Sequence, residues 1–362
     1  MRELEYHGVT QNGTAPAAAL ETPELDGSVE VFSACPVSIG ASGPTYMSTI
    51  WNVARWSERH GCRGILVYAD NRLVDPWLVA QVIVQSTRRL APLVAVQPVY
   101  THPYTVAKMI ATLTDLYGRK LFINWVAGGF KHDLEALADR TPHDERYGRL
   151  VEYASIVRRL TDGERVTVTG KYYEVQGLAL RPPVDAARRP EFVVSGSSPA
   201  GAAAARALGA RSVTYALPLD DRASTDKGPS LGAGLRMGII ARTDRDDAWR
   251  TAFSRFPPDR EGALMRQLAR KVSDSHWHER FCRLADERAG EGSAFWMLPF
   301  ENYKTMCPYL VGTHEDVAAE LSRYMAEGHG TFILDQPETE ADLANAKIAF
   351  DKAKGAMATA TC

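Results

Sequence analysis

The 362-residue sequence contains few cysteines and no long apolar run. Its five cysteines are scattered, and they form neither a CxxC pair nor a cluster with histidine at zinc spacing. This pattern argues against a disulfide framework and against a metal site, and it predicts reduced thiols in a cytoplasmic protein. No segment approaches the roughly 18 apolar residues of a membrane span, and the N-terminus carries no apolar signal segment.

The sequence also lacks a large excess of positive or negative charge. The formal net charge is -2, which predicts no basic surface for nucleic acid and no attraction to an anionic membrane. Neither a GxGxxG motif after a strand nor a P-loop occurs, which argues against a tightly bound nicotinamide dinucleotide or nucleoside triphosphate. The length fits one large α/β barrel or two ordinary domains.

What the sequence does contain is a repeated alternation of buried strands and amphipathic helices. Apolar runs at residues 93–96 and 121–126 flank a helix in which Val106, Ile110 and Leu113 recur at helical spacing. Strands without a polar face, separated by helices, predict a parallel sheet that is covered on its outer side. Eight such strands are predicted, at residues 29–34, 63–68, 93–96, 121–126, 191–195, 212–216, 236–241 and 330–335.

This count predicts an α/β fold of the (β/α)8 TIM-barrel type, with a doubly wound sheet as the alternative. A β-hairpin near residues 165–180 and an irregular, lid-like segment near 254–305 are predicted as insertions. We expect residues 1–27 to form a flexible N-terminal arm and residues 28–362 to form a single domain. Residues 217–233, which are rich in proline, glycine and aspartate, are predicted to be a loop.

Polar side chains gather where the predicted strands end. Gln97, Tyr100 and His102 follow the third strand, and Asn124 and Gly128 mark the end of the fourth. Because the active sites of parallel α/β folds lie at the carboxyl ends of the strands, these are candidate site residues. His102 also has a structural interpretation, as the residue that begins a helix before a proline, and Tyr100 has one as a packing residue.

The most specific local feature is the segment FVVSGSSPA at residues 192–200. A buried strand runs through Gly196, Ser197 and Ser198 directly into a helix N-terminus, where free backbone N–H groups and two hydroxyls converge. This arrangement predicts a phosphate-binding cradle. The alternative is an ordinary serine cap on a tight strand-to-helix turn.

A second feature is the pentapeptide HDERY at residues 143–147, which begins another helix. Thr141 is predicted to be its N-cap and Pro142 its first residue, and the two acids complement the helix dipole. His143 and Tyr147 lie four residues apart on one helical face, so both could reach a ligand at the barrel mouth.

Four segments together resemble the bacterial luciferase-like flavin monooxygenases. They are TVAKMIATLTDLYGRKLFINWVAGG, HDERY, TVTGKYYEVQG and FVVSGSSPAG, and the likeness covers roughly residues 29–350. The most similar branch is that of the two-component alkanesulfonate monooxygenases. The resemblance implies a TIM barrel, FMN at the strand ends, and FMNH2 supplied by a separate NAD(P)H:flavin reductase. It further implies a homodimer or homotetramer that uses O2 to oxygenate a small organic substrate through a flavin C4a-(hydro)peroxide.

The resemblance also implies roles for individual residues. Those implied beside the isoalloxazine ring are Asn124, Ala127 and Gly128. Those implied near the ribityl phosphate are His143 and Tyr147, and those on the phosphate itself are Gly196, Ser197 and Ser198.

The groups expected to face the flavin and the substrate come from two strand ends. Arg236 matches an arginine that the sulfonate enzymes use near flavin and substrate, although it could equally be an ion-paired structural arginine. We predict Arg236, His102 and Tyr100 as catalytic residues and Gln97 as a cofactor contact.

Three positions depart from the sulfonate pattern. Leu73 stands where those enzymes carry a cysteine, Gly238 where they carry a histidine, and Gln336 where they carry a tyrosine. We therefore expect a monooxygenase of specialised metabolism. The alternatives are desulfonation of an alkanesulfonate, F420-dependent hydride transfer on the same barrel, and a non-catalytic flavin-binding or reductase-interacting protein.

Overall fold

The computed structural model describes residues 29–128, 131–219, 233–272, 276–287 and 294–360. The arm predicted at residues 1–27 and most of the loop predicted at 217–233 lie outside these described residues.

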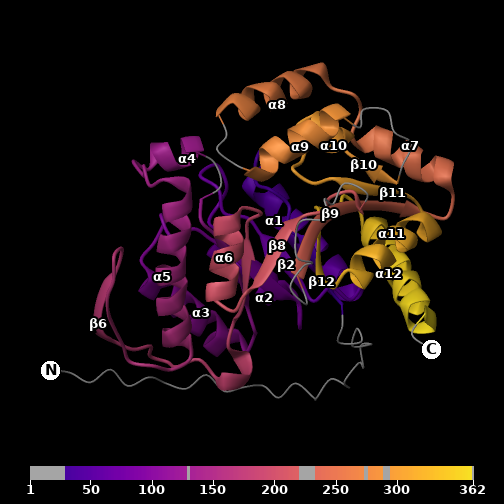
Figure 1. Ribbon diagram of the computed structural model, residues 1–362. Helices are drawn as coiled ribbons and strands as arrows, with labels where there is room; N and C mark the ends of the chain where they lie inside the picture. Colours follow the sequence, from indigo (N-terminus) through magenta and orange to yellow (C-terminus); the bar gives the residue numbers. More distant parts are fainter. Residues whose placement is uncertain (1–28, 129–130, 220–232, 273–275, 288–293, 361–362) are drawn as a thin grey trace, which may run out of the picture.

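Eight parallel strands form a closed barrel (Figure 1). In spatial order they are β1 (Glu30–Ala34), β2 (Gly64–Val67), β3 (Ala91–Val96), β4 (Phe122–Val126), β7 (Glu191–Ser195), β8 (Arg211–Tyr215), β9 (Ala233–Arg242) and β12 (His329–Leu334). The sheet closes because β8 pairs with β9 and β12 pairs with β1. The predicted (β/α)8 barrel is thus confirmed.

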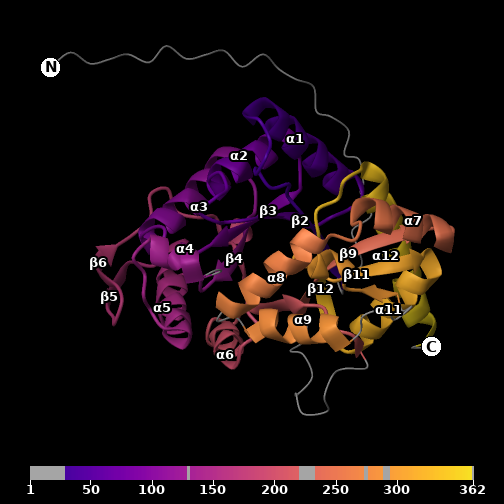
Figure 2. The same cartoon turned by 90° about the horizontal axis from the view of Figure 1, so that it is seen from above.

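Helices cover the outside of the barrel (Figure 2). They are α1 (Gly43–Arg59), α2 (Pro76–Ser86), α3 (Pro103–Tyr117), α5 (His143–Thr161), α6 (Pro199–Ala207), α11 (His314–Ala326) and α12 (Glu340–Ala360). A short helix that the sequence did not suggest, α4 (Lys131–Ala136), precedes α5. Among the described residues, no helix has both the length and the apolar character needed to cross a membrane.

Large apolar side chains fill the barrel interior. Phe32 and Phe122 meet edge to face, with their ring centroids 5.1 Å apart. Phe32 fits because Gly64 faces it: a Cβ at position 64 would lie 2.8 Å from the Phe32 ring and 2.3 Å from the carbonyl oxygen of Ala91. The interior around Phe32 and Phe122 is therefore a packed core.

The hairpin predicted near residues 165–180 is present as β5 (Val166–Thr169) and β6 (Glu174–Leu178). Its turn is held against α5 by the Glu152 carboxylate, which accepts hydrogen bonds from the backbone N–H groups of Lys171, Tyr172 and Tyr173.

The segment predicted as irregular near residues 254–305 is instead largely regular. After α7 (Arg245–Arg255) it forms α8 (Arg260–Val272), α9 (His276–Glu287), β10 (Phe295–Trp296) and α10 (Leu298–Glu301), and β11 (Tyr309–Thr313) follows. The first half of β9 pairs inside the barrel, whereas its second half continues beyond it and pairs with β11. Figures 1 and 2 show α8 above the barrel, over the carboxyl ends of the strands.

Candidate active site

A cavity of about 550 Å³ lies at the carboxyl ends of the barrel strands. Two opposite parts of its lining differ in chemistry. The part that we call the serine wall contains Asn124, Gly128, His143, Tyr147, Ser195, Gly196, Ser197 and Ser198. The part that we call the arginine wall contains Tyr68, Tyr215, Arg236, Thr305, Tyr309 and Asp335.

The serine wall is centred on the N-terminus of α6. Ser198 is the N-cap of this helix, and its Oγ accepts a hydrogen bond from the backbone N–H of Gly201 at 3.1 Å. Ser198 is buried and also lines the cavity, so capping and ligand contact are compatible at this position. The first-turn amides of a helix have no partner within the helix, so they are available to an anion.

Tyr147 lies against the turn that leads into α6. A Cβ at position 196 would lie 2.4 Å from the Tyr147 Oη, so glycine is needed there for this approach. The His143 ring packs edge to face on Tyr147, with centroids 5.4 Å apart. The predicted pair His143 and Tyr147 is therefore brought together beside Gly196 and the two serines.

The start of α5 differs from the predicted capping. Pro142, not Thr141, is the N-cap, and it makes no side-chain capping bond. Thr141 instead donates its hydroxyl to Asp139 at 2.6 Å, and Arg149 pairs with the same carboxylate at 2.6 Å. This compact network fixes the turn that presents His143.

The floor of the serine wall comes from β4 and β7. The Oγ of Ser195 donates to the Oδ1 of buried Asn124 at 2.7 Å, which joins the two strand ends. Gly128 has a φ of +148°, and a Cβ there would lie 2.9 Å from Leu134, so only glycine fits. Ala127 also lines the cavity.

Arg236 on β9 is enclosed by two tyrosines. Its Nη2 donates to the Tyr68 Oη at 2.6 Å, and its Nη1 donates to the Tyr215 Oη at 3.2 Å. The guanidinium carbon lies 4.9 Å and 5.4 Å from the two ring centroids, within cation–π range. The Arg236 charge faces Asp335 at 3.9 Å.

Asp335, which follows β12, joins the arginine wall to the segment from the end of α7 to β11, which we call the cap. Its Oδ2 accepts hydrogen bonds from the hydroxyls of Thr305 at 2.6 Å and Tyr309 at 3.0 Å. Burial raises the pKa of Tyr68 and of Tyr215, and the nearby Arg236 charge lowers these pKa values only in part. Both tyrosines are therefore neutral hydroxyls at physiological pH.

Part of the cavity wall comes from the cap. The Trp277 ring on α9 lies over Tyr215, with centroids 4.6 Å apart and a tilt of 36° between the ring planes. Phe256, which follows α7, also lines the cavity. These aromatic surfaces reduce the contact of the arginine wall with water.

Three predicted site residues are not part of the cavity lining. Gln97 donates to the carbonyl oxygen of Ala69 at 3.1 Å, and Tyr100 donates to the Asn71 Oδ1 at 2.7 Å. His102 is the N-cap of α3, because its Nδ1 accepts a hydrogen bond from the backbone N–H of Tyr104 at 3.1 Å. In the structure these residues shape the loop after β2 and the start of α3.

Most of the arginine wall was missed by the sequence analysis. Tyr68 and Asp335 are the last residues of two predicted strands, so their positions could have indicated the site. Thr305 and Tyr309 carried no such signal, because they lie in or just before β11, a strand that is not part of the barrel.

The serine wall fits the phosphate of a flavin mononucleotide. It combines a helix N-terminus, two hydroxyls and a glycine turn held close to Tyr147. No group of three or more His, Cys, Asp or Glu side chains suited to a metal ion occurs in the part of the chain that the structure describes.

Comparison with known proteins shows the family to which the chain belongs. A family model described as luciferase-like monooxygenase matches residues 29–329. The 4-(gamma-L-glutamylamino)butanoyl-[BtrI acyl-carrier protein] monooxygenase BtrO of Niallia circulans is 33% identical over 304 residues, which cover 82% of this chain and 89% of that protein.

Two solved structures illustrate the shared fold. The oxygenating constituent of 3,6-diketocamphane monooxygenase of Pseudomonas putida, a type II Baeyer-Villiger monooxygenase in complex with FMN, has a TM-score of 0.66 at 15% identity, covering 90% of this chain and 96% of that one. An F420-dependent secondary alcohol dehydrogenase in complex with an F420-acetone adduct has a TM-score of 0.63 at 18% identity, covering 90% and 99%. Because the family model spans most of the barrel, this protein belongs to the luciferase-like monooxygenases and is a flavin-dependent monooxygenase.

Proposed function

We propose that this protein is a cytoplasmic, homo-oligomeric FMNH2-dependent monooxygenase that uses O2 to oxygenate a small organic substrate of specialised metabolism. A separate NAD(P)H:flavin reductase supplies the reduced flavin. The observation that carries the proposal is the serine wall, a phosphate cradle that opens into a cavity whose opposite wall is a buried arginine cluster. Bound reduced flavin supplies the activation of O2.

The serine wall holds the cofactor by its phosphate. The first-turn amides of α6 and the hydroxyls of Ser197 and Ser198 bind the anion, and Tyr147 limits the space above the Gly196 turn. The FMN complex of the camphane enzyme, which has the same fold, supports FMN as the ligand.

The arginine wall orients the substrate and stabilises negative charge. Arg236 is held in one position by Tyr68, Tyr215 and Asp335, so little reorganisation accompanies the reaction. Aromatic side chains of the cap keep bulk water away from this cluster.

Desulfonation is not the proposed reaction, because the space needed for the sulfonate pattern is occupied. A Cβ at position 238 would lie 2.2 Å from the ring of Tyr309, so no histidine fits where the sulfonate enzymes carry one. Leu73 and Gln336 line the cavity in place of the expected cysteine and tyrosine. At these three positions the lining therefore offers an aromatic ring, an aliphatic side chain and an amide. The relative BtrO supports a substrate from specialised metabolism.

The experiment that tests the proposal is a titration of the protein with FMN and, separately, with F420, followed by flavin fluorescence. We expect FMN to bind, and we expect Ser197→Ala to weaken it. Reduced FMN bound to the protein is then mixed with O2, and H2O2 release is compared with that of free reduced FMN. We expect slower flavin reoxidation and less H2O2 from the bound flavin. Binding of F420 without FMN binding would instead establish the hydride-transfer alternative, for which the F420-dependent neighbour is the precedent.

A further inference from the structure

The outer face of α8 carries exposed apolar side chains. Leu264, Met265 and Leu268 form a patch on one side of the helix, and they are 56%, 49% and 49% exposed. Contiguous exposed aliphatic groups on a helix mark an interaction surface more often than a stability device. We call these three residues the α8 patch.

The polar side of α8 is the side that packs on the protein. Arg266 pairs with Asp286 of α9 at 3.1 Å, and Arg270 pairs with Glu279 of α9 at 2.6 Å. A surface helix ordinarily buries its apolar face and exposes its charged face. In α8 this order is reversed, so the ion pairs with α9 hold the apolar face outward.

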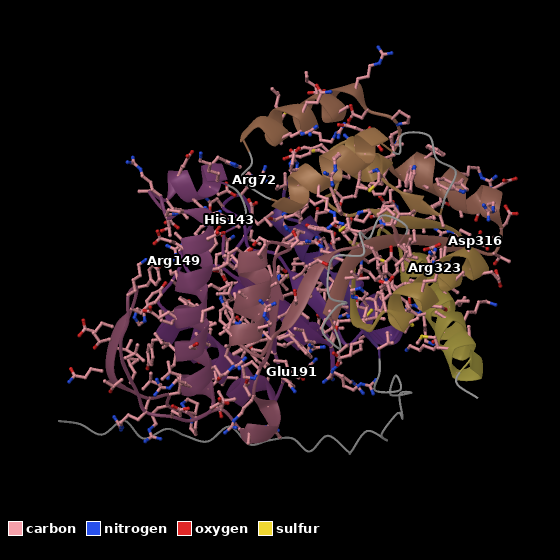
Figure 3. All side chains as sticks on the ribbon, viewed as in Figure 1. Arg72, His143, Arg149, Glu191, Asp316 and Arg323 are labelled. Carbon is pink, nitrogen blue, oxygen red and sulfur yellow. The ribbon has the colours of Figure 1, made fainter. Side chains whose placement is uncertain are left out.

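The start of α8, the helix that carries the patch, lies beside the mouth of the cavity. Two lining residues have well-exposed side chains, Arg72 at 61% and Lys304 at 46%, so the cavity reaches the surface between them. Lys304 pairs at 2.5 Å with Asp259, the residue directly before α8. Figure 3 shows Arg72 and His143 at the same end of the barrel, below α8, and Glu191 at the opposite end.

The charge of α8 is opposite to that of the whole chain. The α8 sequence carries four basic residues and one glutamate, a net of +3, and the α9 sequence carries two arginines and three acids, a net of -1. The two helices together therefore carry +2 after the acids that pair with Arg266 and Arg270 are counted, whereas the chain carries -2. A local positive charge beside an apolar patch is complementary to an acidic protein that presents an apolar helix. A patch of three side chains suits a transient encounter better than a permanent interface between subunits.

We propose that the α8 patch docks an acidic acyl carrier protein, which delivers its thioester-linked acyl group through the adjoining mouth to the cavity. The inference rests on the proposed monooxygenase function, and the carrier-bound substrate in the name of the relative BtrO supports it. The substrate class is then an acyl group on a flexible prosthetic arm. The carrier holds the arm at the rim near Arg72 and Lys304, and only the acyl end enters between the two walls.

The test uses the full-length protein and the holo form of the BtrI acyl carrier protein as the probe. Binding is followed by the fluorescence anisotropy of a labelled carrier in the absence of flavin. We expect measurable binding to the wild type and a loss of about tenfold in affinity for Leu268→Glu. Leu116→Glu is the matched control, because Leu116 on α3 is 67% exposed but is not part of α8, and it leaves the affinity unchanged.

Three outcomes would overturn the docking proposal. They are no binding to the wild type, equal weakening by the two glutamate variants, and a change in the oligomeric state of Leu268→Glu in sedimentation, which would make the patch an interface between copies. FMN titration of the same variants separates this proposal from the proposed function. FMN binding without carrier binding refutes the docking surface alone, and carrier binding without FMN binding refutes the flavin proposal alone.

Discussion

The two walls of the cavity are built in different ways. The serine wall comes mainly from two short stretches of sequence, the start of α5 and the turn from β7 into α6. The arginine wall is assembled from the ends of four barrel strands together with two residues of the segment around β11. The serine wall therefore depends on local backbone geometry, and the arginine wall depends on the closure of the whole barrel. Substitutions in the first wall are expected to affect binding, and substitutions in the second are expected to affect stability as well.

The largest expected effect is on the arginine wall. Asp335→Ala removes the acceptor of Thr305 and Tyr309 and the carboxylate that faces Arg236, so a buried positive charge loses its compensation. We expect the free energy of unfolding to fall by about 3–5 kcal/mol, measured by urea denaturation.

Asp335→Asn is the matched variant, because it keeps an acceptor for both hydroxyls while removing the charge. It is expected to lose less stability than Asp335→Ala. If both variants were as stable as the wild type, the arginine wall would not depend on Asp335, and the contrast between the walls would fail.

A smaller effect is expected from Gly196→Ala in the serine wall. The new Cβ would lie 2.4 Å from the Tyr147 Oη, so the tyrosine must move away from the α6 turn. We expect the affinity for FMN to fall about tenfold, equivalent to about 1.4 kcal/mol of binding free energy. The free energy of unfolding should change little.

The contact itself can be tested by a double-mutant cycle. Tyr147→Phe removes the hydroxyl that the new methyl group meets, so the double variant should recover part of the affinity lost by Gly196→Ala. Strictly additive losses would show that the two positions act independently.

A third prediction separates capping from phosphate binding within the serine wall. Ser198→Ala removes the cap of α6 and is expected to cost about 1 kcal/mol of stability, whereas Ser197→Ala is expected to cost almost none. Both variants should weaken FMN binding. Thermal unfolding and FMN titration of the two proteins measure these effects, and an equal loss of stability in both would contradict the capping assignment.

A further expected effect is a dependence of stability on acidic pH. Burial tends to raise the pKa of Asp139, but the hydrogen bonds from Arg149 and Thr141 outweigh it and lower the pKa from 3.8 to about 2. A carboxyl group whose pKa is lower in the folded state stabilises the fold above its unfolded pKa, and that contribution is lost as the pH falls. The stabilising contribution of the Asp139 carboxylate is therefore lost as the pH falls from about 4 to about 2.

Asp139→Asn isolates this contribution. The difference in unfolding free energy between wild type and variant should be constant above about pH 4 and should shrink toward pH 2, as measured by urea denaturation at a series of pH values. A difference that did not change with pH would show that Asp139 is not an ionised partner of Arg149.

The sequence by itself determined the barrel and the serine wall. Alternating apolar runs and helical spacing specify strands and helices locally, and eight repeats of that pattern lead to a closed sheet. Gly196, Ser197 and Ser198 were found because a strand, a turn and a helix start lie next to one another in the chain. His143 and Tyr147 were found because helical periodicity places them on one face.

Only the tertiary structure decided which of the other polar residues reach the cavity. Tyr68, Tyr215, Arg236 and Asp335 meet because barrel closure brings the ends of β2, β8, β9 and β12 together, and Tyr309 joins them because β9 continues beyond the barrel to pair with β11. Gln97 and His102 also follow a barrel strand, but their side chains form hydrogen bonds with backbone groups instead of lining the cavity. The physical reason is that a hydrogen bond between distant segments depends on strand register and barrel closure, and neither is specified by the residues immediately around either partner.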